Sequence, residues 1–397
     1  NAEKDRIWPR LGIAYRPSDK WVVRAGFGVY NNANQINNLT VIPNPFRVFR
    51  VSIVADPANP TGLTLQNPYP IGQAAAAPPL SVVAVTPDRV NAYNVQWSFS
   101  IQRQLSSATA FEAAYVGSQA SHLDNSRNIN NAPPGPGAVQ ARRPYPRWGQ
   151  IRYLGDDGKA YFNSLQLRGE RRFARGFSFL TSYTWAHNID QAYGTNESLP
   201  FSTNGIQNVD CWACERSDSG FDYRHRFTTS FLWDIPVAKD WTGPAGYVLK
   251  NWQFNGILTY QSGFPYAITQ QGNSQNTDAS PQRPDYVPGQ SPSLDKSARS
   301  PERWFNTAAF RVANQKFGDV GRNVLRQPAM KTWDIGIFKN FPVKEGHRFQ
   351  FRFEAFNLFN TPQFRAPGGS LGTPTFGQIT STWLDSRQVQ LGLKYLF

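Results

Sequence analysis

The feature that most constrains the fold of this chain is a strict alternation of apolar and polar residues. Between Val95 and Gln102, for example, Val, Trp, Phe and Ile alternate with Gln and Ser. Successive side chains of a β-strand point to opposite faces, so this period of two predicts a strand with one apolar and one polar face.

The same alternation recurs along the chain and predicts further strands. Their apolar sides are Trp21, Val23, Ala25, Phe27 and Val29; Phe111, Ala113 and Tyr115; Leu165 and Leu167; Phe177, Phe179, Thr181, Tyr183 and Trp185; Phe227, Thr229, Phe231, Trp233 and Ile235; Trp252, Phe254, Gly256, Leu258 and Tyr260; Phe349, Phe351, Phe353 and Ala355; and Val389, Leu391, Leu393, Tyr395 and Phe397. Together with Arg10–Tyr15 and Thr332–Lys339, about eleven strands of about ten residues are predicted, the length at which a tilted strand spans a bilayer.

The composition agrees with a membrane barrel. Mean hydropathy is −0.50 and no apolar stretch is long enough for a transmembrane helix. A barrel strand shows lipid only every second side chain, so its average hydropathy stays low. The 28 Phe, 16 Tyr and 12 Trp suit the aromatic girdles at the two membrane interfaces.

The connections distinguish a barrel from a β-sandwich, whose core would suit the same apolar faces. Short connections are predicted at Arg16–Lys20, Ser106–Ser107, Ala174–Gly176, Pro236–Lys250 and Phe341–Gly346; long ones at Asn31–Asn91, Ser118–Ala160, Asn188–Arg224, Ser262–Met330 and Leu358–Arg387. The two kinds alternate, as barrels with short periplasmic turns and long outer loops require, and compact soluble domains rarely carry such loops. The loops are rich in Pro, Gly, Asn and Ser, as in Asn131–Gly137 and Gly272–Asp295, and are expected to form no core of their own.

The net charge of +14 has two interpretations, a nucleic-acid binder or cations dispersed over strands and loops. We favour dispersal, with no nucleic-acid partner, because no run of Lys and Arg exceeds two residues. No catalytic, Walker or Rossmann motif occurs, so neither an enzyme nor a cofactor is expected. The four His are far apart in sequence, so no metal site is expected.

The two cysteines, Cys211 and Cys214, form one CxxC motif. Such a pair could be a redox centre, half a zinc site or a loop disulfide. No second CxxC and no thioredoxin-like pattern accompany it, so a small disulfide that stiffens the loop Asn188–Arg224 is the favoured prediction.

Two stretches near the C-terminus carry a resemblance to a known class. Gln388–Phe397 alternates and closes on Phe397, and it resembles the terminal strand that the barrel-assembly machinery recognises in outer-membrane barrels. An ordinary edge strand is the alternative. Phe349–Thr361, which reads Phe-Gln-Phe-Arg-Phe-Glu-Ala-Phe-Asn-Leu-Phe-Asn-Thr, is similar to the penultimate-strand motif of TonB-dependent receptors. In that motif, Asn357–Asn360 would end the strand at the outer rim.

Two further stretches resemble the Oar-like branch of these receptors. They are Phe221–Phe227, which contains Asp-Tyr-Arg-His-Arg-Phe and opens a strand, and the loop stretch Trp304–Phe310. A rim or lumen hydrogen-bonding role is expected for His225, which lies between two Arg.

The resemblance implies an all-β, transmembrane antiparallel β-barrel with long extracellular loops in the bacterial outer membrane. Residues 1–397 would supply the C-terminal part, about eleven of about 22 strands. The plug, the TonB-contact segment and the N-terminal half of the barrel are not in this sequence. The chain begins at Asn1 without a signal peptide, and we expect a fragment with two unpaired sheet edges that is unstable in isolation.

The resemblance also implies active, TonB-dependent uptake of an unidentified extracellular ligand. The implied partners are outer-membrane lipid and lipopolysaccharide, the barrel-assembly machinery, and TonB through the missing N-terminal part. Alternatives are a surface adhesion barrel, a passive porin and a soluble β-sandwich module. Candidate ligand contacts are aromatic and cationic residues in predicted loops: Trp148, Arg152, Trp212, Trp304 and Arg311.

Overall fold

The computed structural model describes residues 7–31, 79–191 and 206–397. Eleven strands follow one another in a single antiparallel path, and two short strands, β3 (Val82–Val85) and β8 (Ser217–Asp218), complete the sheet. The path is β1 (Arg10–Ser18), β2 (Trp21–Asn31), β4 (Tyr93–Gln104), β5 (Thr109–Asn128), β6 (Ile151–Ala174), β7 (Phe177–Asp190), β9 (His225–Asp234), β10 (Trp252–Gln261), β16 (Met330–Lys344), β17 (His347–Phe356) and β19 (Gln388–Leu396). The prediction of about eleven strands is confirmed. Residues 1–5 and the central parts of the predicted connections Asn31–Asn91 and Asn188–Arg224 lie outside the described residues.

The strand registers place the predicted apolar sets on one continuous face. Leu167 of β6 lies opposite Ala113 of β5 and Tyr183 of β7. Its neighbour Gln166 points to the other face, opposite Ala114 and Thr184. Because the period is two, a one-residue slip of a strand would move its apolar set to the other face, so the matching patterns exclude such a slip.

The polar face carries an apolar patch that the alternation did not predict. Leu180 of β7 lies opposite Ser230 of β9, and Ser230 lies opposite Ile257 of β10. Leu232 of β9 lies on the same face. Leu180 and Ile257 are both exposed, so nothing in the described chain covers this part of the polar face.

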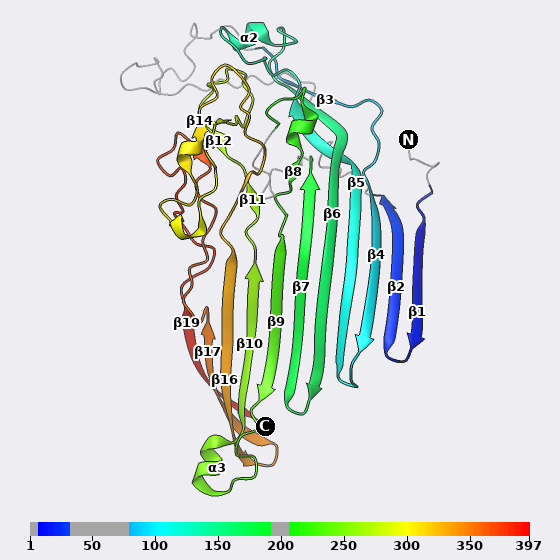
Figure 1. Ribbon diagram of the computed structural model, residues 1–397, viewed down its shortest axis with the longest axis vertical. Helices are drawn as coiled ribbons and strands as arrows, with labels where there is room; N and C mark the ends of the chain where they lie inside the picture. Colours follow the sequence, from blue (N-terminus) through cyan, green and yellow to red (C-terminus); the bar gives the residue numbers. More distant parts are fainter. Residues whose placement is uncertain (1–6, 32–78, 192–205) are drawn as a thin grey trace, which may run out of the picture.

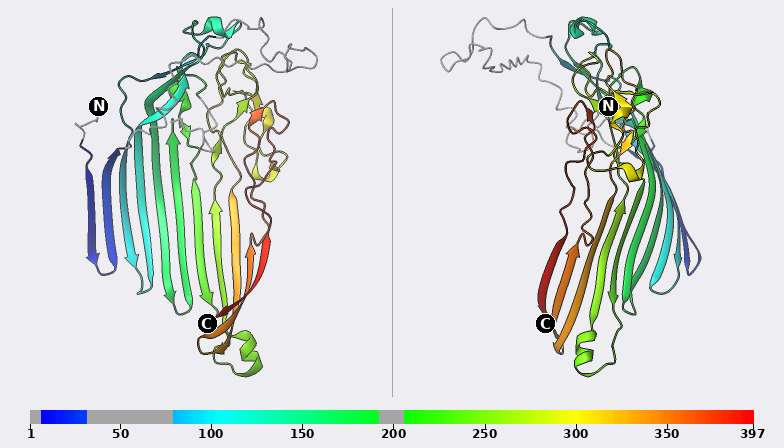
Figure 2. Two further views of the ribbon diagram at one scale, coloured as in Figure 1. Left: turned by 180° about the vertical axis from the view of Figure 1, so that it is seen from behind. Right: turned by 60° about the vertical axis from the view of Figure 1, so that its left-hand side comes forward.

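All five short connections lie at one end of the sheet (Figures 1 and 2). One of the two-residue connections joins β6 to β7 through Arg175 and Gly176, with φ of 53° and 78°. Two consecutive positive φ angles define the type I′ turn, whose twist suits a hairpin. The connection between β9 and β10 differs from the others, because it holds helix α3 (Gly243–Leu249).

The described parts of the long connections lie at the opposite end, as predicted, but one of these connections is shorter than expected (Figure 2). The stretch Ser118–Ala160 was predicted as a loop, which was wrong, because β5 runs to Asn128 and β6 begins at Ile151. These 20- and 24-residue strands pair beyond the apolar alternation, through residues such as Asn125 and Arg127. A backbone ladder needs no apolar face, so two strands can pair beyond the alternating stretch.

The remaining helices of residues 7–31, 79–191 and 206–397 are short: α2 (Val139–Arg142) and three 3-10 turns, η1 (Trp212–Glu215), η2 (Lys296–Ala298) and η3 (Thr307–Ala309). No helix in the described part of the chain is long and apolar enough to cross a membrane.

An added charge should destabilise the protein much more on the apolar face of the sheet than on the polar face. Leu167→Arg places a cation on the apolar face of β6, whereas Gln166→Arg places it on the polar face of the same strand. If the apolar face contacts lipid, we expect Leu167→Arg to cost about 2–4 kcal/mol near the bilayer midplane and Gln166→Arg to cost far less. Urea unfolding in phospholipid vesicles measures both, and equal costs would contradict the assignment of the faces.

Candidate functional site

The long connections gather into one structure at the upper end of the sheet, which we call the loop assembly (Figure 1). It comprises residues 129–150, 206–224, 262–329 and 357–387. Three short strand pairs hold it: β11 (Pro265–Tyr266) with β15 (Leu325–Arg326), β13 (Asp285–Tyr286) with β14 (Phe310–Arg311), and β12 (Thr269–Gln270) with β18 (Ser370–Leu371).

The loop assembly has a hydrophobic core, so the expectation that the loops would form none was wrong. The buried members are Ile268, Phe305, Ala309, Phe310, Val320 and Leu325. The rings of Phe305, Phe310 and Phe376 meet edge to face, with centroids 5.1–6.0 Å apart. These apolar residues are separated by polar and Pro-rich sequence. The strand pairs and further backbone hydrogen bonds, such as that from Trp304 to Gly377, bring them together.

A buried ion pair joins two of the loops. Glu215 of residues 206–224 accepts two hydrogen bonds, each 2.8 Å long, from the guanidinium of Arg283 in residues 262–329. The two side chains are 0% and 4% exposed. The side-chain oxygen of Gln207 accepts hydrogen bonds from the Arg283 backbone N–H and the Gln275 amide, at 2.7 and 3.0 Å. Bidentate geometry and these neighbours offset part of the cost of removing the charges from water.

A second ionic cluster lies where β7 and β9 enter the loop assembly. The carboxylates of Asp218 and Asp222 each pair with Arg224 and Arg326, and Asp218 also bonds His187 at 2.9 Å. His187, Asp218 and Asp222 are close enough together to hold a metal ion. Two guanidinium groups already neutralise these carboxylates, so the arrangement is an ion-pair network that ties the loops to the rim.

The cluster explains one of the stretches on which the resemblance rests. In Phe221–Phe227, Asp222 accepts the backbone N–H of Asn188 at 2.7 Å and so fixes the start of β9 against β7. His225 bonds the hydroxyl of Tyr183 at 2.8 Å, which is the rim hydrogen-bonding role expected for it.

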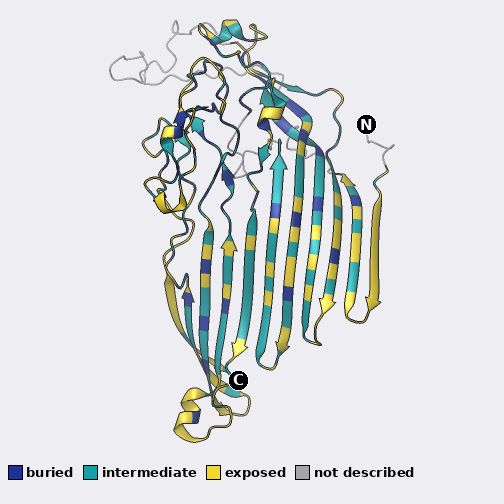
Figure 3. Cartoon of the chain, in the orientation of Figure 1, coloured by how far each residue is buried: buried dark blue, intermediate teal, exposed yellow. Residues whose placement is uncertain are grey.

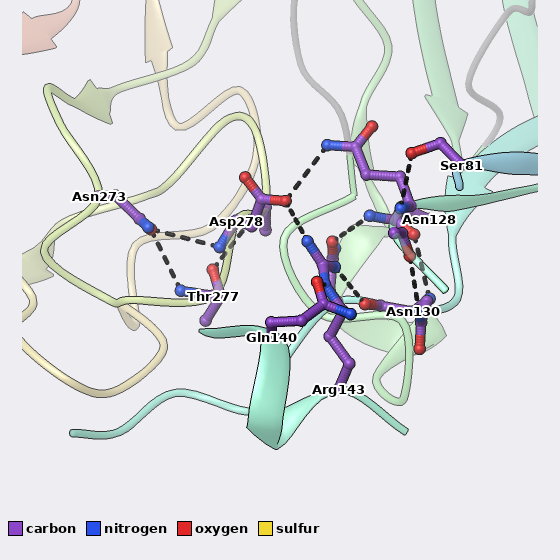
Figure 4. Close-up of polar contacts among 12 residues, drawn as sticks. Ser81, Asn128, Asn130, Gln140, Arg143, Asn273, Thr277 and Asp278 are labelled. Atoms are coloured by element: carbon purple, nitrogen blue, oxygen red, sulfur yellow. Dashed lines mark hydrogen bonds and ion pairs between the residues drawn. The ribbon is translucent and has the colours of Figure 1, made fainter. Parts of the chain in front are cut away.

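The loop at residues 129–150 is joined to residues 262–329 by a third set of contacts (Figure 4). Arg143 donates to the carboxylate of Asp278 at 2.6 Å and to the backbone oxygen of Asn130. The side-chain oxygen of Asn273 accepts the backbone N–H groups of Thr277 and Asp278 and shapes the turn that presents this carboxylate. The loop assembly is therefore cross-linked by charged hydrogen bonds at several points.

The loop assembly contains a pocket of about 340 Å³. It is lined by Tyr266, Ser293, Leu294, Arg299, Trp304, Phe305, Val324, Leu325 and Arg326. The guanidinium of Arg299 lies over the ring of Trp304, 5.6 Å from its centroid. The hydroxyl oxygen of Tyr266 is buried and has no hydrogen-bond partner among the described residues. Burial raises the pKa of this hydroxyl, so it remains a protonated donor.

Of the predicted ligand contacts, only Trp304 lines this pocket. Trp148 lies exposed in residues 129–150. Trp212 begins η1, and the guanidinium of Arg127 lies 5.2 Å from its ring centroid. Arg311 is an exposed residue of β14, 3.9 Å from the buried carboxylate of Asp285. Arg152 is a residue of β6 that bonds Ser126, so its expected position in a loop was wrong.

Tyr266 and Arg299, which line the pocket, were missed by the sequence analysis. Both lie in a polar stretch without regular alternation, and their distance from one another in the chain hides their proximity. The side chain of Arg299 is held by its hydrogen bond to the backbone oxygen of Leu294, 3.0 Å away. The one signal in the sequence was that Arg299 and Trp304 are close enough along the chain for their side chains to stack.

Cys211 and Cys214 are joined as a disulfide at the start of η1, directly before the buried Glu215. Their oxidation in the cell stays a prediction. At the other end of the molecule, the terminal Phe397 is 91% exposed and its ring lies 5.8 Å from that of Tyr395. The strand β17 ends at Phe356, and Asn357 and Asn360 take positive φ angles of 52° and 50°, so Asn357–Asn360 ends the strand at the rim as expected.

Residues 1–390 match the family model of the outer membrane beta barrel domain. The chain belongs to this family. It is therefore an outer-membrane β-barrel chain, its apolar face is the one that contacts lipid, and the loop assembly and short turns lie at the two ends of the barrel wall. No curated protein matches the sequence.

Three solved structures illustrate what the chain is similar to. The FrpB iron transporter of Neisseria meningitidis (F3-3 variant) is 10% identical, with a TM-score of 0.44 over 98% of this chain and 39% of its own. FpvA of Pseudomonas aeruginosa, bound to heterologous pyoverdines, is 9% identical, with a TM-score of 0.47 over 99% and 33%. The ferric-catecholate import receptor Fiu of Escherichia coli is 10% identical, with 0.45 over 98% and 34%. The chain thus spans about a third of the length of these proteins.

Breaking the buried ion pair should loosen the loop assembly. Arg283→Met leaves the Glu215 carboxylate buried without its counter-charge, and we expect a loss of about 3–5 kcal/mol in the local stability of the loops. Amide hydrogen exchange of residues 206–224 and 262–329 measures the loss. Arg303→Met, which removes an exposed cation of the same loop, is the control, and equal exchange in the two variants would contradict the prediction.

The stability of the ionic cluster at the rim should decrease as the pH falls. Burial raises the pKa of Asp218, but hydrogen bonds from His187 and Arg326 and the charges of Arg326 and Arg224 outweigh it and lower the pKa below its ordinary value of 3.8. The resulting stabilisation is present above that value and is lost as the pH falls through the lowered pKa. Hydrogen-exchange protection of residues 217–224 should exceed that of Asp218→Asn from about pH 7 down to about pH 4. Below the lowered pKa the two proteins should converge, and a gap that persists there would show that the charge is not the cause.

Proposed function

We propose that this chain forms the C-terminal part of the barrel of a TonB-dependent receptor, which takes up an extracellular ligand across the outer membrane. The observation that carries the proposal is the folded loop assembly with its pocket. A surface that only had to cover a pore would need no internal core, buried ion pair or shaped cavity. The assembly is instead built to hold a few side chains in place, as a binding site requires.

The apolar patch on the polar face supports the presence of a plug. Leu180 and Ile257 are 43% and 50% exposed toward the lumen. A water-filled porin lumen gains nothing from such side chains, whereas a plug domain would bury them. We therefore assign residues 1–397 to the C-terminal barrel wall, and place the plug, the TonB contact and the remaining strands in sequence outside this chain.

The stretches Phe221–Phe227 and Trp304–Phe310 support the Oar-like branch within these receptors. The first contributes Asp222 to the ionic cluster, and the second contributes Phe305 and Phe310 to the core of the loop assembly. Lipopolysaccharide around the outer rim and the barrel-assembly machinery at Phe397 are the remaining partners that this assignment implies.

The pocket indicates the kind of group that the ligand presents. Trp304 and Tyr266 contribute aromatic rings to the lining, Arg299 contributes a positive charge, and the buried Tyr266 hydroxyl has no hydrogen-bond partner among the described residues. A flat ring that bears an anionic or oxygen-rich substituent satisfies all three. Among the residues predicted from the sequence, Trp304 is thus the best-supported ligand contact, and Trp148, Trp212, Arg152 and Arg311 remain candidates around it.

The proposal is tested by the uptake of compounds too large for porins. Cells that express the complete protein, and cells that lack it, are grown in complex medium, and the compounds left in the spent medium are compared by mass spectrometry. We expect at least one compound to be depleted only in expressing cells, and only while the proton-motive force is intact. Depletion that survives a protonophore would indicate a porin, and no depletion would favour the adhesion alternative.

The pocket residues can be tested in the same assay. Arg299→Gln removes the cation over Trp304, and we expect uptake of the depleted compound to fall about tenfold or more, the loss of roughly one charge-assisted contact. Arg303→Gln is the matched control, because Arg303 lies in the same loop, is exposed and does not line the pocket. Equal uptake by the two variants would exclude the pocket as the binding site.

A further inference from the structure

The connection between β9 and β10 exposes an unusual amount of apolar surface for a periplasmic turn. It carries α3, which lies beyond the lower ends of the strands beside the C-terminus and is almost wholly exposed (Figures 1 and 3). The large exposed apolar residues of this connection are Val237, Trp241, Tyr247, Val248 and Leu249. Trp241, Tyr247 and Val248 are each more than half exposed, at 55%, 55% and 59%. Exposure of such a cluster to water is unfavourable, because its apolar surface is not buried.

A lysine on the lipid-facing side holds α3 in place. The register sets Lys339 opposite Trp252 and Phe351, on the apolar face of the sheet. The side chain is nevertheless only 2% exposed. Its ammonium group donates to the backbone oxygens of Tyr247, at 2.9 Å, and Lys250. These carbonyls belong to the C-terminal end of α3, where helices leave acceptors unpaired and carry partial negative charge.

The position of Lys339 shows on which side of the barrel wall α3 lies. A bare ammonium group toward lipid is costly, so it needs polar partners at that depth. The carbonyls of α3 supply them, and the rings of Trp252 and Phe341 flank the ammonium at 5.6 and 5.2 Å. The helix therefore packs on the outside of the wall, on the lipid-facing side, and not across the lumen.

Aromatic contacts make α3 continuous with the lower aromatic girdle. The Tyr247 ring lies 5.7 Å from the ring of Phe341, and Phe341 is opposite Phe349. The ring of Phe349 in turn lies 5.0 Å from that of Tyr395. The indole N–H of Trp252 donates to the backbone oxygen of Val248 at 2.9 Å. The exposed side of α3 thus extends a surface that already contacts the membrane.

We propose that α3 and its flanking Trp241 form an interfacial anchor that inserts among the phospholipid headgroups of the periplasmic leaflet. Trp and Tyr favour this level of a bilayer, because their rings are apolar while their N–H and O–H groups remain hydrated. The apolar side chains of Tyr247, Val248 and Leu249 can be buried at the boundary between headgroups and acyl chains. The anchor depends on the outer-membrane location of the chain and not on transport, so failure of the proposed uptake function would leave it intact.

The test measures the depth of a spin label on the complete protein in vesicles of phosphatidylethanolamine and phosphatidylglycerol. Val248→Cys carries the label on α3. Ser107→Cys labels the short turn between β4 and β5 and reports water, and Leu167→Cys labels the lipid-facing side of β6. Unmodified protein, whose two cysteines are joined, gives the labelling background. Accessibility to dissolved oxygen and to a water-soluble nickel chelate is compared by electron paramagnetic resonance.

We expect the label at residue 248 to collide more with oxygen than with nickel, at a depth between those of residues 107 and 167. Nickel accessibility equal to that of Ser107→Cys would overturn the proposal, since α3 would then lie in the periplasm. Protection from both reagents would also overturn it, because a protein would cover the helix.

Lys339→Gln tests the attachment of α3 in the same background. Loss of the ammonium removes the charge that holds the helix carbonyls, and we expect the label at residue 248 to become more accessible to nickel. The measurement on Val248→Cys alone stands if this variant fails to fold. An unchanged depth in a folded Lys339→Gln protein would contradict the role of Lys339 but not the position of α3.

Discussion

The antiparallel backbone ladder from β1 to β19 is the interaction on which the rest of this structure depends. In a bilayer no water is present to satisfy backbone N–H and C=O groups, so each strand must satisfy those of its neighbours. That requirement makes a continuous ladder of paired strands necessary and leaves the side chains free to divide into a lipid-facing set and a lumen-facing set. Every other feature is attached to the two ends of this wall.

The two ends of the barrel wall meet different physical requirements. At the periplasmic end the ladder only has to reverse, and a pair such as Arg175 and Gly176 suffices. At the outer end the loop assembly folds in water, and it is stabilised in the same way as a soluble protein. Apolar side chains gather around Phe305, and charges are buried only where they are paired, as in Glu215 with Arg283. This division allows a rigid wall to present shaped loops.

Charge placement shows the same logic on the lipid side. In the loop assembly a cation is buried beside a carboxylate, as Arg283 is beside Glu215. On the lipid-facing side of the wall, the ammonium of Lys339 is instead covered by the carbonyl end of α3. A turn that is longer than the ladder requires thereby becomes part of the membrane-contacting surface.

The sequence by itself determined the wall. The period of two predicts the strands, their faces and the alternation of short and long connections, because each of these follows from local geometry between adjacent residues. The same period could not predict the loop assembly. There Tyr266 and Trp304 line one pocket, and Phe310 packs against Phe376, which lies on another loop segment. The sequence also placed Arg152 in a loop, because the polar extensions of β5 and β6 lack the alternation that lipid imposes. Such contacts depend on which distant segments meet above the rim, and only the tertiary structure decides that.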